Sequence, residues 1–330
     1  MAENKRFFYG WLILLTCILI MGLGYAPLVS CASLFTKPVT EDLGFTRSGY
    51  ALVSTIAALM MAFMSPFIGK IMSKPYMHKA LVVCMIGNCL AYYCYSFAST
   101  LPQFYVTAAC IGFFECGSTM IPVSVLITNW FRKKRGLVMS IAMVGSSIGG
   151  TILSPIIGNL IASQGWRFTY KAVGITRLVI LVPLVLLVIR RTPADMGTKA
   201  YGADEEGETG KARKTEREWN VSLKEVKKKP MFWCFVLGCT LISATAAVIT
   251  QIPASVMDAG YATTTAASIA SLYLFIAIPG KLVLGHIYDR YGVKAGILFG
   301  NTMFFLSVIC LIFIKHQPFL YLMAILFGFG

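Results

Sequence analysis

The chain has 330 residues, of which 57% are hydrophobic and 13% are charged, and its mean hydropathy is +0.73. A soluble domain is about half apolar and about one quarter charged, so this composition excludes an ordinary water-soluble globule and a disordered chain. In a soluble protein the net charge of +15 would indicate nucleic-acid binding, but in so apolar a chain it indicates basic loops beside a lipid bilayer. We therefore expect the bilayer, and no nucleic acid, as a partner.

Long apolar runs predict an all-α membrane protein, because they lack the alternation of barrel strands and a helix crosses a bilayer with about 20 apolar residues. We predict spans at 8–34, 48–69, 80–98, 102–129, 137–162, 169–189, 231–256, 265–286 and 293–314. A tenth span begins near Pro318 and stops at Gly330. A helix that ends in mid-bilayer leaves its last carbonyls without partners, so we expect a C-terminally truncated sequence.

One long polar stretch divides the chain. It predicts a six-helix bundle at 1–190, a cytoplasmic linker at 191–230 and a partial second bundle at 231–330. Within the linker, 221–229 could form a short amphipathic helix on the membrane surface. Most of the 29 Lys and Arg residues lie at the N-terminus, in the linker and in alternate loops. Because basic residues collect on the cytoplasmic side, we expect a multi-pass protein of the cell membrane with a cytoplasmic N-terminus.

Two ionisable residues lie inside predicted spans, where a charge is costly and therefore indicates function. Glu115 lies midway along the fourth span, and a carboxyl group in an apolar site can carry a proton. Glu115 is thus a candidate coupling site, and a structural hydrogen bond is an equal alternative. Arg177, in the sixth span, could attract an anion or pair with Glu115, although we expect its side chain to extend to the membrane interface.

Neutral residues in the spans could also bind a carboxylate, or could only join helices through hydrogen bonds: Tyr25, Ser146, Ser147, Gln251 and Tyr273. The ten cysteines and three histidines have no metal-site or nucleophile spacing. No phosphate-binding Gly-rich motif is present. We therefore expect no enzyme activity, no metal and no cofactor.

The segment GHIYDRYGVK follows the eighth span and resembles a loop signature of the major facilitator superfamily, G-x-L-x-D-R-x-G-R-K. The matching residues are Gly285, Asp289, Arg290, Gly292 and Lys294. The resemblance implies a 6+6 helix fold and a loop that latches one conformational state. The glycines permit close helix approach, and the carboxylate can meet a helix N-terminus or basic side chains of neighbouring spans. The corresponding first-half segment has Ser73 in place of the acid, so a latch there must be weaker or different.

The segment NWFRKKRGLVMSIAMVG resembles the start of the fifth helix in monocarboxylate and oxalate/formate porters. The residues that we assign to this motif are Phe131, Lys133, Lys134, Arg135 and Gly145. The stretches 35–54 and 165–168 also resemble this branch. In oxalate-type carriers, basic residues of the eighth and eleventh spans take part. Here Lys281 lies near the predicted cytoplasmic end of the eighth span, which leaves no basic residue at mid-depth, and no eleventh span is present.

The resemblance implies a secondary carrier for a small organic anion, a monocarboxylate or an oxalate-like ion. It would work by alternating access, as symport with protons or as exchange with a counter-substrate anion. The alternatives are a non-transporting membrane protein, such as a sensor relative or an inactive fragment, and an exporter of another small solute.

Overall fold

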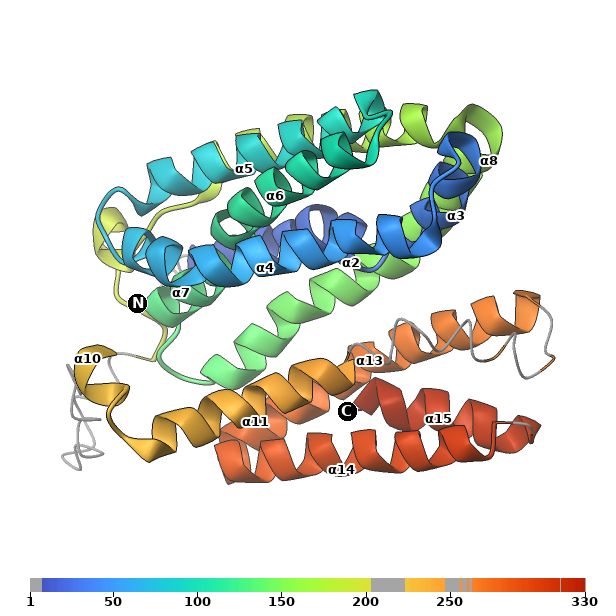
Figure 1. The fold of residues 1–330 in the computed structure, drawn as a ribbon. Helices are drawn as coiled ribbons and strands as arrows, with labels where there is room; N and C mark the ends of the chain where they lie inside the picture. Colours follow the sequence, from blue (N-terminus) through green and yellow to red (C-terminus); the bar gives the residue numbers. More distant parts are fainter. Residues whose placement is uncertain are drawn as a thin grey trace, which may run out of the picture.

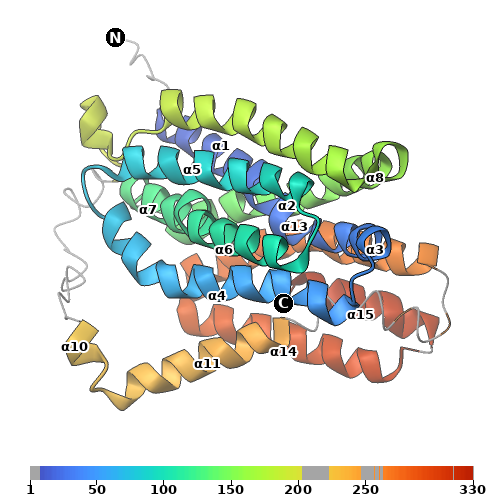
Figure 2. The same ribbon diagram turned by 45° about the horizontal axis from the view of Figure 1, so that its top comes forward.

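The computed structural model describes residues 8–202, 223–246, 263–314 and 316–329, together with Val256 and Gly260. These parts are helical except for turns, loops and one isolated bridge, so the all-α prediction is confirmed. Helices α1 to α8 form one group, called here the N-terminal group, and α13 to α15 form a second, the C-terminal group (Figure 1). The same two groups are visible after rotation (Figure 2).

The first span is longer than predicted and changes its helix type. Its segments are α1 (Gly10–Leu19), a π-helix (Ile20–Tyr25), α2 (Ala26–Val29) and α3 (Ala32–Leu43). The next helices are α4 (Arg47–Met72), α5 (Met77–Cys94), the 3₁₀ turn Tyr95–Phe97, α6 (Leu101–Ser118) and α7 (Met120–Trp130). The break between α6 and α7 falls at Thr119, whose φ of −123° and ψ of −99° are not helical.

Helix α8 (Arg135–Val188) contains the two spans predicted at 137–162 and 169–189. At about 1.5 Å per residue its 54 residues would measure about 80 Å, far more than the roughly 30 Å of a bilayer core. The chain instead turns back at Gly165, where φ is 81° and ψ is 165°. This left-handed region favours glycine, since a Cβ atom is disfavoured there. Gly165 therefore separates two crossings.

The remaining elements are the 3₁₀ turn Pro193–Met196, α10 (Leu223–Val226), α11 (Pro230–Ala246), α13 (Thr263–Tyr291), α14 (Val293–Ile312) and α15 (Gln317–Phe329). Within the described residues, seven helical segments are long and apolar enough to cross a membrane, with α8 counted once. The count of nine to ten spans stays a prediction. Part of the span predicted at 231–256 lies outside the described residues.

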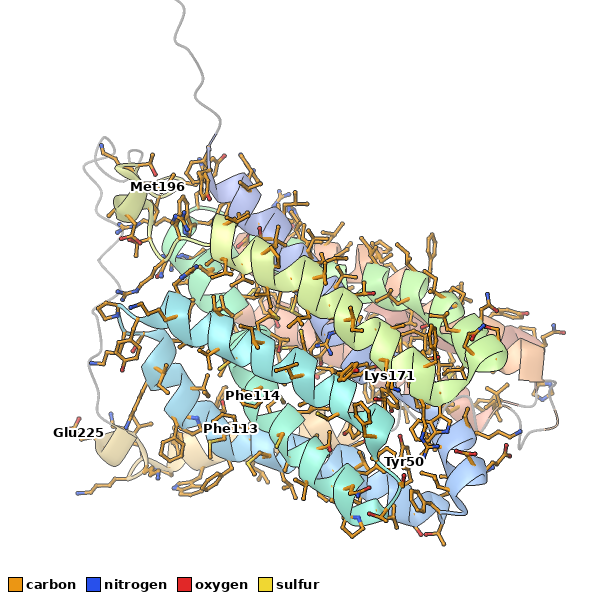
Figure 3. The ribbon with its side chains drawn as sticks, turned by 90° about the horizontal axis from the view of Figure 1, so that it is seen from above. Tyr50, Phe113, Phe114, Lys171, Met196 and Glu225 are labelled. Carbon is orange, nitrogen blue, oxygen red and sulfur yellow. The ribbon has the colours of Figure 1, made fainter. Side chains whose placement is uncertain are left out.

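The outer faces of the helices expose large apolar side chains, as expected for contact with lipid. Leu59, Phe63 and Val106 are each about two thirds exposed. Figure 3 shows side chains standing out from the helices, including Phe113. In a soluble protein such faces would be covered or polar. Their exposure agrees with the composition.

Glycines bring the first span into backbone contact with the start of α8. A Cβ atom at Gly149 would overlap the Gly22 carbonyl oxygen, and one at Gly145 would overlap the Ile18 carbonyl oxygen. Such small-xxx-small spacing allows close packing of membrane helices. By contrast, Gly158, on the same helix, has no atom within 4 Å of such a Cβ position.

We expect Gly149→Ala to destabilise the protein by about 1–3 kcal/mol, because the added methyl group forces α8 away from the first span. The midpoint of thermal unfolding in detergent would fall. The matched control Gly158→Ala would leave this midpoint unchanged or raise it, since alanine favours helix and the space is open. Equal midpoints for the two variants would contradict the close packing.

Candidate functional site

Helices α8 and α13 make the described contact between the two groups, and one carboxylate anchors it. The Asp289 carboxylate accepts hydrogen bonds from the backbone N–H of Gly136 (3.0 Å) and of Leu137 (2.8 Å). These N–H groups lie in the first turn of α8, where no intrahelical partner exists and the helix dipole favours a negative charge. The Asp289 carboxylate thus meets a helix N-terminus, one of the two kinds of partner expected from the sequence.

Glycines make this approach possible. A Cβ atom at Gly136 would lie 2.7 Å from Asp289 Oδ1, and one at Gly285 would overlap the Ser140 side chain. Two turns toward the middle of α13, Lys281 reaches α8. The residue pairs 289 with 136, 285 with 140 and 281 with 143–147 run in opposite directions along the two helices. They form one antiparallel seam, called here the α8–α13 seam.

The fifth-span motif and the loop signature, about 150 residues apart in sequence, therefore meet at one point. Phe131 is buried and forms an isolated parallel bridge with Tyr201. Lys134 adopts a left-handed conformation (φ 56°), which turns the chain into α8, and Arg135 Nε donates to the Phe131 carbonyl (2.9 Å). The side chain of Lys133 is exposed, and its backbone N–H donates to the Tyr201 carbonyl.

The other loop-signature residues lie around the turn between α13 and α14. Gly292 has a φ of 85° and precedes α14, so it is the residue that requires glycine's conformational freedom. The Arg290 guanidinium carbon lies 5.5 Å from the centre of the Tyr291 ring, and Lys294 is exposed. In the first-half copy, the Ser73 hydroxyl donates to the Lys70 carbonyl of its own helix (2.8 Å).

Lys281 is the main finding that sequence reasoning missed. Its ammonium group donates to Ser147 Oγ (2.7 Å), Ser146 Oγ (3.0 Å) and the Met143 carbonyl (3.2 Å). Because α13 continues to Tyr291, beyond the predicted end at 286, Lys281 lies about 15 Å from the helix end. The last turns of α13 carry the exposed residues Asp289 and Arg290, so the depth of Lys281 in a bilayer stays a prediction.

An open pocket of about 430 Å³ adjoins this lysine. It is lined by Met120, Ile121, Ser124, Val125, Met139 and Met143. These residues come from α7 and from the first part of α8. Met143 both lines the pocket and offers its carbonyl oxygen to Lys281. The pocket is therefore mainly apolar, and Met143 is the residue that it shares with the Lys281 contact.

Arg177 lies inside the N-terminal group and contacts two other helices. It is 2% exposed, so the expectation that it extends to the membrane interface was wrong. Its Nη2 donates to the Gly24 carbonyl (2.8 Å) in the π-helix and to Asn88 Oδ1 on α5. Its guanidinium carbon lies 4.9 Å from the centre of the Tyr92 ring. A buried arginine needs such acceptors, and the π-helix supplies one of them.

Glu115 is 7% exposed and lies within electrostatic reach of Arg177 and Tyr25. Among the described residues, Glu115 and Arg177 form no ion pair. The backbone carbonyl of Glu115 accepts hydrogen bonds from the Thr119 N–H (3.1 Å) and hydroxyl (2.9 Å), at the break between α6 and α7. Glu115 thus lies beside the break between α6 and α7 and close to the π-helix of the first span.

The remaining candidates are not brought together. Tyr25 lies in the π-helix and packs against the core of the N-terminal group. Tyr273 lies in the C-terminal group, with its ring 5.5 Å from that of Phe327 on α15. Gln251 falls outside the described residues. Within the described part of the chain, no group of three or more His, Cys, Asp or Glu could hold a metal ion.

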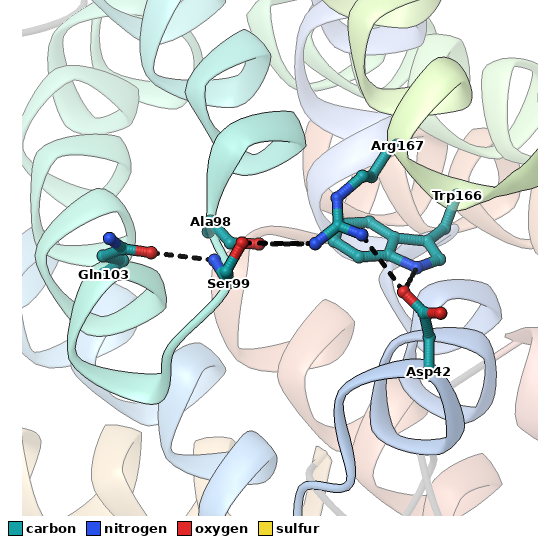
Figure 4. A network of polar contacts seen from close by, with 6 residues as sticks. All are labelled: Asp42, Ala98, Ser99, Gln103, Trp166 and Arg167. Carbon is teal, nitrogen blue, oxygen red and sulfur yellow. Dashed lines mark hydrogen bonds and ion pairs between the residues drawn. The ribbon is translucent and has the colours of Figure 1, made fainter.

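At the end of the N-terminal group that holds Gly165, a second polar network joins three connections (Figure 4). The Asp42 carboxylate accepts from Trp166 Nε1 and from Arg167 Nη1, each at 3.1 Å. Arg167 also donates to Ser99 Oγ (3.3 Å), and the Ser99 N–H donates to Gln103 Oε1 (2.8 Å). Two stretches that resemble the organic-anion branch, 35–54 and 165–168, are thus in direct contact.

Comparison with known proteins agrees with this architecture. The chain is 23% identical to human Monocarboxylate transporter 2 over 229 residues, which cover 68% of this chain and 45% of that protein. It is 26% identical to the MFS-type transporter pytF of Aspergillus terreus over 209 residues, covering 63% of this chain and 62% of that protein. The chain therefore matches less than two thirds of the length of each of these relatives.

A crystal structure of a bacterial homologue of the human lysosomal transporter Spinster, inward-facing and unoccupied, superimposes with a TM-score of 0.62. The match covers 100% of this chain and 74% of that chain at 16% identity, which supports the fold alone. The model of the family described as Major Facilitator Superfamily matches residues 12–330. With its apolar helices and its seam between two helix groups, this chain is a multi-pass membrane protein that belongs to the Major Facilitator Superfamily.

Proposed function

We propose that this protein is a secondary carrier for a small organic anion, and that Lys281 is the group that binds the anion. The carrier works by alternating access, as symport or exchange. The observation that carries this proposal is a half-buried ammonium group between two helix groups, whose partners in the described chain are all neutral oxygens. The names of the monocarboxylate transporters among the relatives support the class of substrate.

The lack of an acidic partner for Lys281 favours an anion that binds and dissociates. Among the described residues, the ion pairs are Lys37–Glu41 and Arg167–Asp42, and neither involves Lys281. A half-buried charge within a membrane-spanning helix is costly without a partner of opposite sign, so residues of this kind mark substrate pathways. The apolar pocket beside Met143 suits the hydrocarbon part of a small carboxylate.

The orientation of the protein belongs to the same proposal. The exposed basic residues Lys70, Lys74, Lys79 and Arg132 lie in or beside connections at the end of the N-terminal group where the first span begins. Basic residues collect in cytoplasmic loops, so we place this end, the N-terminus and the linker in the cytoplasm. As the location of the protein we propose the cell membrane.

Glu115 is the proposed coupling site for protons. A carboxyl group that is 7% exposed can exchange a proton only when a conformational change gives it access to water. Its position at the break between α6 and α7, against the π-helix, gives it neighbours that such a change would rearrange. Exchange of one anion for another requires no net proton movement.

For Lys281→Met we expect the rate of anion counterflow in proteoliposomes to fall at least about a hundredfold, equivalent to about 3 kcal/mol. The panel of anions is formate, oxalate, lactate and pyruvate. Lys281→Arg would retain part of the rate, because the charge remains. The matched control Lys37→Gln removes an exposed lysine from a surface ion pair and would leave the rate unchanged.

Retention of counterflow in Lys281→Met would contradict the role of Lys281. Absence of counterflow for every anion of the panel in the unmodified protein would contradict the carrier proposal and favour a non-transporting relative.

For Glu115→Gln we expect proton-driven uptake to be abolished while anion exchange continues, because glutamine keeps the shape of the side chain and cannot carry the proton. Uptake driven by a pH gradient and counterflow without a gradient would be measured on the same vesicles. Glu41→Gln, at an exposed position of α3, is the control. An unchanged dependence of uptake on pH would exclude Glu115 as the coupling site.

A further inference from the structure

The ammonium group of Lys281 has no hydrogen-bonding capacity left in this structure. A lysine ammonium carries three N–H donors and no acceptor. Here three oxygens surround it: Ser147 Oγ, Ser146 Oγ and the Met143 carbonyl. An anion can therefore bind Lys281 only by replacing at least one of these oxygens.

We propose that Ser146 and Ser147 compete with the transported anion for Lys281, so that anion binding releases the contact between α8 and α13 at this level of the seam. This inference rests on the proposed function, since it concerns the same ammonium group. It assigns the two serines a role as partners of the empty carrier, in place of a role as ligands of the anion.

The surroundings of the ammonium group favour competition over joint binding. The Ser146 hydroxyl donates its proton to the Met143 carbonyl (2.8 Å), so it offers Lys281 a lone pair. The Met143 carbonyl is an acceptor only. Two of the three oxygens, Ser146 Oγ and the Met143 carbonyl, therefore have no proton to donate to an incoming carboxylate. The anion gains access when α8 moves away or when the lysine side chain turns.

The position of this contact in the seam links binding to movement of the groups. Lys281 occupies the inner end of the seam, next to the Gly285–Ser140 contact and two turns from the Asp289 contact with Gly136 and Leu137. When the Lys281 contact is lost, the Gly285–Ser140 contact and the Asp289 contact remain to hold the two groups together. By linkage, a variant that weakens the inner contact must bind the anion more tightly.

The test is equilibrium binding of the four anions to the purified Ser146→Ala/Ser147→Ala variant by isothermal titration calorimetry. We expect Kd to fall about tenfold relative to the unmodified protein, because hydrogen bonds to the charged group no longer oppose binding. Ser163→Ala is the matched control, since this exposed serine of α8 bonds only to the Asn159 carbonyl in the described structure (2.8 Å). Its Kd would not change. A higher or unchanged Kd in the double variant would overturn the proposal, a higher value indicating direct ligands.

A second measurement without any anion separates this inference from the proposed function. Hydrogen–deuterium exchange reports the protection of the Gly136 and Leu137 amides, which Asp289 provides. We expect faster exchange of these amides in the double variant, and in the milder Ser147→Ala, than in Ser163→Ala. Unchanged exchange would overturn the inference. If amide exchange became faster in the variants while the unmodified protein bound no anion, the role of the serines in the α8–α13 seam would be supported. The proposed substrate class would then be wrong.

Discussion

Charged groups inside an apolar helix bundle must find their partners within that bundle, and this constraint organises the structure. Arg177 joins the π-helix of the first span to α5, and Asp289 joins α13 to the first turn of α8. Lys281 draws its partners from the other group. Each of these three residues contacts a helix other than its own. For the buried Arg177 and the half-buried Lys281 the reason is that the apolar surroundings offer no water as a partner. A small number of polar contacts thus joins the helices to one another.

The polar contacts are of two kinds, those within one helix group and those between the two groups. The Arg177 contacts and the Asp42 network lie within the N-terminal group and hold its helices to one another. The contacts of Lys281 and Asp289 lie between the groups. Contacts within a group favour a rigid body, and contacts between groups are the ones that relative movement must break. A rigid body and a breakable seam are what alternating access requires, which is why we propose this mechanism.

The sequence predicted most of the architecture and little of the site. Apolar runs located the helices, and the loop signature correctly led to the contact of Asp289 with a helix N-terminus. The contact of Lys281 with Ser146 and Ser147 was missed because it joins two helices that lie far apart in the sequence. Arg177 was misjudged because its partner Asn88 has no periodic or charged signal that would identify it. Such pairings depend on how helices pack in three dimensions, which one sequence does not encode locally.

The π-helix at Ile20–Tyr25 changes the helical phase of the first span. One added residue in an α-helix turns everything that follows by about 100°, whereas a widened turn absorbs the addition and leaves both flanks in place. A helical wheel drawn through the whole span therefore loses its phase between α1 and α2. Relatives with an unbroken α-helix here would present the same faces with one residue fewer. An alignment of such relatives with this chain would need a gap inside a membrane span, beside Gly22 and Gly24.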